Sequence, residues 1–152
     1  MKKKLGFTLI ELLVVIGIIA ALTAVVFVAI DPAKRFRDSR NARRITDADT
    51  ILAAVHQYIV DTGGSLPAGI GNSMYQIGTC GTAATTLCSG AGSTACVDMS
   101  TILSINKYLK TNPQDPQSGS AATTGYAIAK DVNNLFTVSA CLAEGTTISI
   151  SR

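Results

Sequence analysis

The stretch FTLIELLVVIGIIAALTAVVFVAI, residues 7–30, decides how the rest of the chain must be organised. Glu11 is the only charged residue in it. As an α-helix rising about 1.5 Å per residue, the stretch would extend about 36 Å, more than the hydrocarbon core of a bilayer, which is about 30 Å thick. The sequence therefore predicts a membrane-spanning helix over residues 7–30.

A short basic segment, residues 1–6, precedes this helix. Lys2, Lys3 and Lys4 are consecutive, which is typical of the positive end of a targeting segment. They also account for the formal net charge of +3, because 10 of the 13 basic residues remain without them, against 10 acidic residues. The basic balance of the whole chain therefore gives no indication of nucleic-acid binding.

The helical pattern continues beyond the apolar stretch, in residues 31–62. Pro32 should kink or interrupt a helix, yet apolar residues recur after it at spacings of three and four. This stripe consists of Ile45, Ala48, Leu52, Val55 and Ile59. The pair Gly63-Gly64 then ends the pattern. We predict one long helix over residues 7–62, bent or loosened near Pro32, whose second half packs on a head domain.

The remaining residues, 63–152, are predicted to form a globular head. Residues 65–95 are rich in Gly, Ser, Thr and Ala and lack periodicity, so we expect a loop region there. A short helix is expected from Asp98, as its cap, to about Leu109. Apolar residues then alternate in residues 126–130, 136–142 and 148–150. The expected fold is α+β, with the helix packed on a small three-stranded antiparallel sheet.

All the cysteines lie in the head, at Cys80, Cys88, Cys96 and Cys141. An even number of cysteines outside a membrane anchor fits an oxidising compartment and two disulfides. Three connectivities are possible, and we favour Cys80–Cys88 as a local bridge with Cys96–Cys141 tying the loop region to the sheet. The single histidine, His56, gives little support for a zinc site and is expected to be a partly buried helix residue.

The order of features at the N-terminus resembles the class III signal of type IV prepilins and type II secretion pseudopilins. The motif is Leu5-Gly6-Phe7-Thr8-Leu9-Ile10-Glu11, behind a basic leader and ahead of an apolar helix. The resemblance covers residues 1–30 closely and the organisation through residue 62 loosely. It implies cleavage by a prepilin peptidase between Gly6 and Phe7, and N-methylation of Phe7.

Glu11 is an unusual residue for a membrane span, because a lone carboxylate there is costly and normally has a purpose and a partner. Cleavage before Phe7 would create a new amine four residues from Glu11. The resemblance implies that this acidic residue serves assembly, by pairing with the amine of a neighbouring subunit or of the same chain. The alternative is a tolerated charge near the helix end that reaches the interface by snorkelling.

Six basic residues follow the span: Lys34, Arg35, Arg37, Arg40, Arg43 and Arg44. The positive-inside rule alone would place this run in the cytoplasm, whereas the resemblance places the leader end inside. We interpret the run as a solvated helix face or an inter-subunit charge zone. DNA uptake is an alternative, since arginines can follow phosphates.

Cofactors and catalysis are not expected. The stretch Pro113-Gln114-Asp115-Pro116 resembles a short pattern near a calcium-bearing loop of major pseudopilins, so Asp115, Asp131 and Asn133 are weak calcium candidates. Turns use the same residue types, and the acidic density is low for calcium. No nucleophile, zinc-protease or phosphate-loop motif is present. The chain is therefore not expected to be an enzyme.

The sequence thus predicts a structural subunit with a leader at 1–6, a transmembrane and assembly half-helix at 7–30, a head-packing half-helix at 31–62 and a head at 63–152. It would sit in the cytoplasmic membrane as a single-pass protein and then join a surface filament for adhesion, motility or uptake. Its partners would be copies of itself, prepilin peptidase and the inner-membrane assembly platform. Alternatives are a type II secretion pseudopilin or competence pilus subunit and, more distantly, an anchored binding module that never polymerises.

Overall fold

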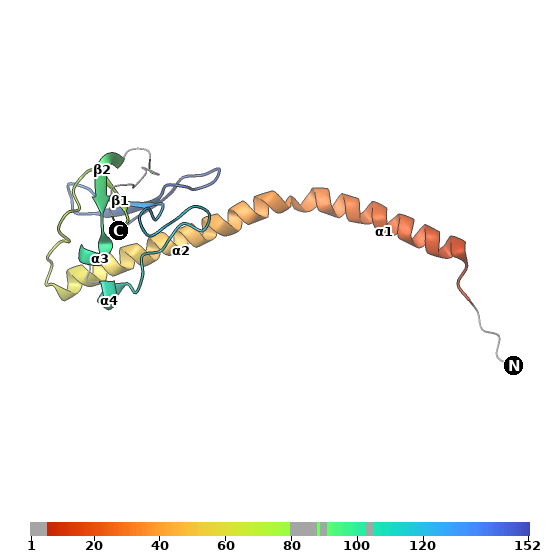
Figure 1. Ribbon diagram of the computed structural model, residues 1–152, viewed down its shortest axis with the longest axis horizontal. Coiled ribbons are helices and arrows are strands. Elements are labelled where there is room, and N and C mark those ends of the chain that lie inside the picture. Colours follow the sequence, from red (N-terminus) through yellow and green to blue (C-terminus); the bar gives the residue numbers. More distant parts are fainter. Residues whose placement is uncertain (1–5, 80–87, 89–90, 103–104) are drawn as a thin grey trace. The chain divides into compact units, whose positions relative to one another are not determined.

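The computed structural model describes residues 6–79, 88, 91–102 and 105–152 (Figure 1). The chain divides into two compact units, Met1–Arg37 and Asp38–Arg152. The first unit contains helix α1, Leu9–Ile30, and the start of helix α2, Pro32–Asp61. The second unit contains the rest of α2 and all the strands.

The predicted interruption near Pro32 is confirmed and lies at a single residue. Asp31 ends α1 in the left-handed region, at φ +40°, and its carboxylate Oδ1 accepts the amide of Lys34 at 3.2 Å. Pro32 then occupies the first position of α2, where its missing N–H costs nothing. Asp31-Pro32 is therefore both the end of one helix and a cap for the next.

The sheet of the second unit has five strands, so the expected three-stranded antiparallel sheet is wrong in size and in direction. The strands are β1 (Met74–Ile77), β2 (Ala91–Val97), β3 (Tyr126–Lys130), β4 (Phe136–Ala140) and β5 (Ile148–Ser151), in the order β2-β1-β3-β4-β5. The predicted meander is confirmed in β3, β4 and β5, which pair antiparallel. However, β1 pairs parallel with β2 and antiparallel with β3. Strand β1 and the first five residues of β2 lie in the segment expected to be a loop.

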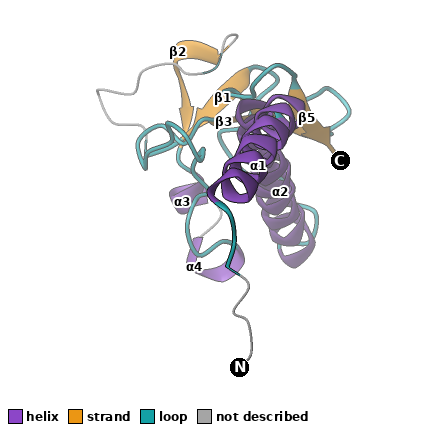
Figure 2. Ribbon diagram, turned by 90° about the vertical axis from the view of Figure 1, so that its right-hand side faces the viewer, coloured by secondary structure: helices purple, strands orange, loops and turns teal. Residues whose placement is uncertain are grey.

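The core lies between α2 and one face of the sheet (Figure 2). Its largest apolar side chains include Ile51, Leu52, Val55, Ile77, Tyr126, Ile128, Phe136 and Val138. The predicted stripe is confirmed at Ala48, Leu52 and Val55, and Ile59 packs against the same core. Ile45 does not, since 45% of it is exposed. The neighbouring Arg44 is buried instead, because its guanidinium has carboxylate partners in the head.

The helix expected from Asp98 to Leu109 is observed as two short helices, α3 (Met99–Ile102) and α4 (Ile105–Tyr108). Residues 103–104, between them, are outside the described residues. Asp98 does act as the predicted cap, because its Oδ1 accepts the Ser100 amide at 2.9 Å. Met99 and Leu109 are buried against the core, and this contact positions the segment.

Candidate processing and assembly site

The predicted cleavage junction lies in non-helical backbone ahead of α1. Gly6 is the first described residue, and a Cβ added to it would meet nothing within 4 Å. The Phe7 side chain is 87% exposed. A peptidase that requires an extended chain and a small residue at its cut would therefore meet no obstacle from the described part of this chain at the Gly6–Phe7 bond.

Glu11 and Thr8 form a reciprocal cap at the first turn of α1. The Thr8 hydroxyl accepts the Glu11 amide at 3.3 Å, and the Glu11 carboxylate accepts the Thr8 amide at 2.8 Å. The Thr8 hydroxyl also donates to the same carboxylate at 2.7 Å. Both of these side-chain bonds fall on Oε2, so a capping box orients the carboxylate and leaves Oε1 without a contact among the described residues. The positive end of the helix dipole favours the charge at this position.

Beyond this cap, α1 exposes its whole apolar surface. None of its residues is buried. By length and composition it could cross a membrane. Gly17 lies midway along it, where an added Cβ would meet nothing within 4 Å. Such a surface requires lipid or protein around it.

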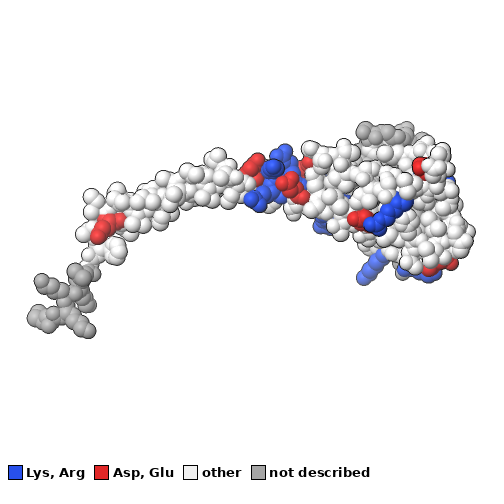
Figure 3. Space-filling model, turned by 180° about the vertical axis from the view of Figure 1, so that it is seen from behind, with Lys and Arg blue, Asp and Glu red and all other residues white. Residues whose placement is uncertain are grey.

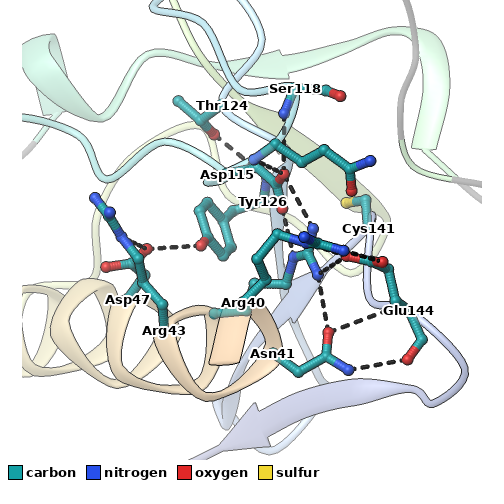
Figure 4. A network of polar contacts seen from close by, with 12 residues as sticks. Arg40, Asn41, Arg43, Asp47, Asp115, Ser118, Thr124, Tyr126, Cys141 and Glu144 are labelled. Carbon is teal, nitrogen blue, oxygen red and sulfur yellow. Dashed lines mark hydrogen bonds and ion pairs between the residues drawn. The ribbon is translucent and has the colours of Figure 1, made fainter. Parts of the chain in front are cut away.

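The basic run does not form one solvated face, and that expectation is wrong at two positions. The Arg44 guanidinium makes a bidentate contact with Asp115, with Nε to Oδ2 at 2.6 Å and Nη2 to Oδ1 at 3.1 Å, and both side chains are fully buried. Arg40 makes a second bidentate pair with Glu144, each bond 2.6 Å long. Figure 4 shows this network between α2 and the loops of the head.

Glu144 and Asn41 connect the two ion pairs. Arg44 Nη1 donates to Glu144 Oε1 at 3.1 Å and to Asn41 Oδ1 at 2.8 Å. The Asn41 amide nitrogen donates to the Glu144 carbonyl at 2.9 Å, and the Glu144 amide donates back to Asn41 Oδ1 at 3.1 Å. Three residues of α2 are thereby fixed to the β4–β5 loop and to the turn that begins at Asp115.

The network lowers the pKa of both carboxylates. Hydrogen bonds from Arg40, and more weakly from Arg44, hold the pKa of Glu144 at about 2 although desolvation raises it. Burial raises the pKa of Asp115, but hydrogen bonds from Arg44 and from the amides of Gln117 and Ser118 outweigh it, so this pKa also lies below its usual value.

Acid should therefore destabilise the head in a defined window. Unfolded Glu144 takes up a proton near pH 4.5, whereas the folded carboxylate does so near pH 2, so protonation favours the unfolded state between these values. The contribution is fully present above pH 4.5 and is lost as pH falls through about 2. Melting temperatures measured by circular dichroism should decline across this range. Glu144→Gln should give a shallower decline, and equal slopes in the two proteins would contradict the assignment.

The disulfide that the structure shows differs from both favoured pairs. Cys88 is bonded to Cys141, with Cα atoms 4.8 Å apart and a sequence separation of 53. This bond excludes Cys80–Cys88 and Cys96–Cys141; Cys80 itself lies outside the described residues. Spacing along the chain could not reveal that Cys88 lies beside the end of β4. Closing a loop of this length stabilises a domain by about 4 kcal/mol in the chain-entropy model.

The calcium candidates take part in other contacts. Arg44 binds both oxygens of Asp115. Asp131 Oδ1 accepts the amides of Asn133 at 2.8 Å and Leu135 at 2.7 Å, which is ordinary turn chemistry. Within the described ranges, no three His, Cys, Asp or Glu side chains form a group that could hold a metal ion. His56 is half-buried on α2, as expected.

Sequence reasoning missed the roles of Arg44, Asn41 and Glu144. A signal was present, since Arg44 precedes Ala48 by one helical turn and so occupies the place where the buried stripe should continue. An arginine on a buried face requires a carboxylate, because an unpaired buried charge is costly. Which carboxylate meets it depends on the fold of loops about 70 and 100 residues away, and local pattern does not specify this.

Comparison with known proteins identifies the N-terminal segment. Residues 1–27 match the family model of the prokaryotic N-terminal methylation motif, which is the class III prepilin signal of type IV pilins and pseudopilins. No curated protein and no solved structure gives a significant match to the chain. The chain thus carries the signal of pilin-like precursors, which implies prepilin peptidase processing, and the signal and α1 together indicate a single-pass membrane anchor.

Proposed function

We propose that this chain is a structural subunit that is cleaved between Gly6 and Phe7 and then polymerises through α1 into a type IV pilus-like filament. The observation that carries the proposal is a prepilin signal joined to a helix that buries none of its residues. A plain anchor would need the apolar surface, but it would not need a carboxylate four residues beyond the new N-terminal residue that the peptidase creates.

Assembly would exchange one apolar environment for another. In the membrane, lipid covers α1, and in a filament other copies of α1 would cover it, so the net cost of leaving the membrane is modest. Small residues let helices approach closely, and Gly17, Ala20 and Ala21 offer such a surface near the middle of α1. The head would remain outside this bundle, displayed on the filament surface.

Glu11 would supply the specificity of this packing. Cleavage releases a positively charged amine on Phe7, and the capping box already orients the carboxylate at the same end of the helix. An amine from a neighbouring subunit can approach Oε1 without displacing Thr8 from Oε2. Within a water-poor bundle such a charge-assisted hydrogen bond is stronger than in water. The role is structural and requires no cofactor and no catalytic group.

N-terminal analysis tests the proposal directly. Intact mass and N-terminal sequencing of membrane-extracted protein should show a chain that begins at N-methylated Phe7. A valine at position 6 places a branched side chain at the cut, so Gly6→Val should accumulate the precursor almost completely. Gly17→Val adds the same bulk where the structure is open and should leave cleavage intact. Native protein that retains its lysine leader would overturn the proposal.

The same chemistry serves long pili, short secretion pseudopili and competence pili. Their subunits would share the signal, the apolar helix and the carboxylate, so the N-terminal unit does not distinguish them. Electron microscopy of filaments sheared from cells, with antibodies against the head, would distinguish extended fibres from structures confined to the envelope.

A further inference from the structure

The basic run after the span divides into two groups of three at the boundary between the two units. The first group consists of Lys34, Arg35 and Arg37, and the second consists of Arg40, Arg43 and Arg44. Every member of the second group has a carboxylate partner within the second unit: Arg40 and Arg44 in the loops of the head, and Arg43 one turn further along α2. The first group, which we call the basic collar, is exposed, and none of its members forms an ion pair with any residue that the structure describes. Contacts within the second unit therefore account for only half of the run.

Two acidic residues flank the collar and limit its charge. Asp31 uses one carboxylate oxygen to cap α2 through the Lys34 amide, and Asp38 is exposed. The local balance is thus three positive charges against two negative ones. The Arg35 Nε also donates to the Ile30 carbonyl at 3.3 Å, and this bond holds the Arg35 side chain against the last turn of α1. Figure 3 shows charged side chains gathered over the start of α2, directly after a long stretch of α1 without charge.

The collar follows the span at the depth of lipid headgroups. Helix α1 has 22 residues and would extend about 33 Å, which matches a hydrocarbon core of about 30 Å. Residues 34–37 then lie about 6 to 11 Å further along the chain, within or just beyond a headgroup layer of about 5–8 Å. Long basic side chains there can bend back to phosphates while their stems stay on apolar surface. Phe36 lies in the same turn and is 66% exposed, so its ring can insert into the membrane–water interface.

We propose that the basic collar binds the phosphate groups of anionic phospholipids in the leaflet from which the head emerges. This inference rests on the proposed function, because it requires α1 to span a membrane. Each Lys or Arg near an anionic surface raises the affinity for anionic lipid by up to about fivefold. The neighbouring carboxylates of Asp31 and Asp38 reduce the combined effect of the three cations. The contact would hold the subunit at a fixed depth before assembly, and extraction into a filament would have to break it.

Lipid selectivity of the full chain tests this. Protein reconstituted in phosphatidylcholine vesicles is probed with spin-labelled phosphatidylglycerol and, separately, spin-labelled phosphatidylcholine, and the motionally restricted fraction of each label is compared. Lys34→Gln/Arg37→Gln removes two collar charges and keeps the Arg35–Ile30 bond. Lys110→Gln/Lys130→Gln removes two charges from the head, where neither lysine forms an ion pair with a described residue. The leader lysines are common to all variants.

The native chain should prefer phosphatidylglycerol, and the collar variant should lose about fivefold of this preference. The head variant should keep it, and salt at about 1 M should remove it from both. An unchanged preference in the collar variant, or an equal loss in the head variant, overturns the proposal. If the collar variant instead loses affinity only for a short DNA duplex, the collar is a nucleic-acid surface. If neither label is restricted by any protein, α1 is not in the bilayer and the proposed function itself fails.

Discussion

Replacing Glu11 with alanine is expected to abolish filaments while the subunit is still made, cleaved and inserted. Insertion should not suffer, because the change removes a charge from an apolar span. Assembly should suffer, because every subunit would bury an unpaired amine, and a lost partner of a buried charge weakens a contact by about a hundredfold or more. The measurement is the ratio of sheared filament to total membrane subunit on an immunoblot.

Two further variants separate the charge of Glu11 from its role as a helix cap. Glu11→Gln can still accept the Thr8 amide but cannot neutralise an amine, so it should fail as alanine does. Thr8→Ala removes the hydroxyl and should cost the first turn of α1 about 0.5–2 kcal/mol, yet it keeps the carboxylate. It should therefore assemble at reduced yield. If Glu11→Gln assembles normally, only the cap matters and the pairing model is wrong.

The features that sequence predicted correctly are those that a local stretch of chain determines. The apolar composition of residues 7–30 predicts a membrane-spanning helix without reference to the rest of the chain. The Asp31-Pro32 pair ends α1 and caps α2, which are the two helices directly beside it. The meander of β3, β4 and β5 was visible because Tyr126, Ile128, Phe136 and Val138 alternate and face one core. In each case the neighbours that matter lie within a few residues.

The features that it missed depend on distant partners. Strand β2 has the sequence Ala-Gly-Ser-Thr-Ala-Cys-Val, which shows no alternation of apolar and polar residues, and it pairs in parallel with β1. The Cys88–Cys141 bond joins residues 53 apart. Arg44 and Ile45 are adjacent in sequence. Hydrophobicity alone predicts that Ile45 is buried and Arg44 exposed, whereas the structure shows the reverse. A carboxylate supplied by Asp115 reverses that preference.

Asp115→Ala is expected to lower the free energy of unfolding of the head by about 3–5 kcal/mol. The Arg44 guanidinium would remain fully buried with only Asn41 Oδ1 and a shared oxygen of Glu144 as acceptors. The turn would also lose its cap, because Asp115 Oδ1 accepts the Gln117 amide at 2.9 Å. Urea denaturation of the full chain in detergent, followed by near-ultraviolet circular dichroism, measures the loss.

A matched arginine and a double variant show whether the buried charge is the cause. Arg43→Ala should change stability by no more than about 0.5 kcal/mol, since its Nε is 3.8 Å from Asp47 and its side chain is 66% exposed. Arg44→Met/Asp115→Leu replaces the ion pair by apolar groups and should be far less destabilised than the sum of Arg44→Met and Asp115→Leu. Strict additivity would mean that the pair contributes through shape alone.

The same variants should leave the N-terminal unit unaffected. The processing junction, the capping box and α1 share no contact with Asp115 among the described hydrogen bonds, and they belong to the other compact unit. Asp115→Ala should therefore still be cleaved after Gly6 while its head unfolds more easily and is lost to envelope proteases. Processed chains that disappear with time in a pulse-chase experiment are the expected result. Accumulated precursor would mean instead that the head must fold before the peptidase acts.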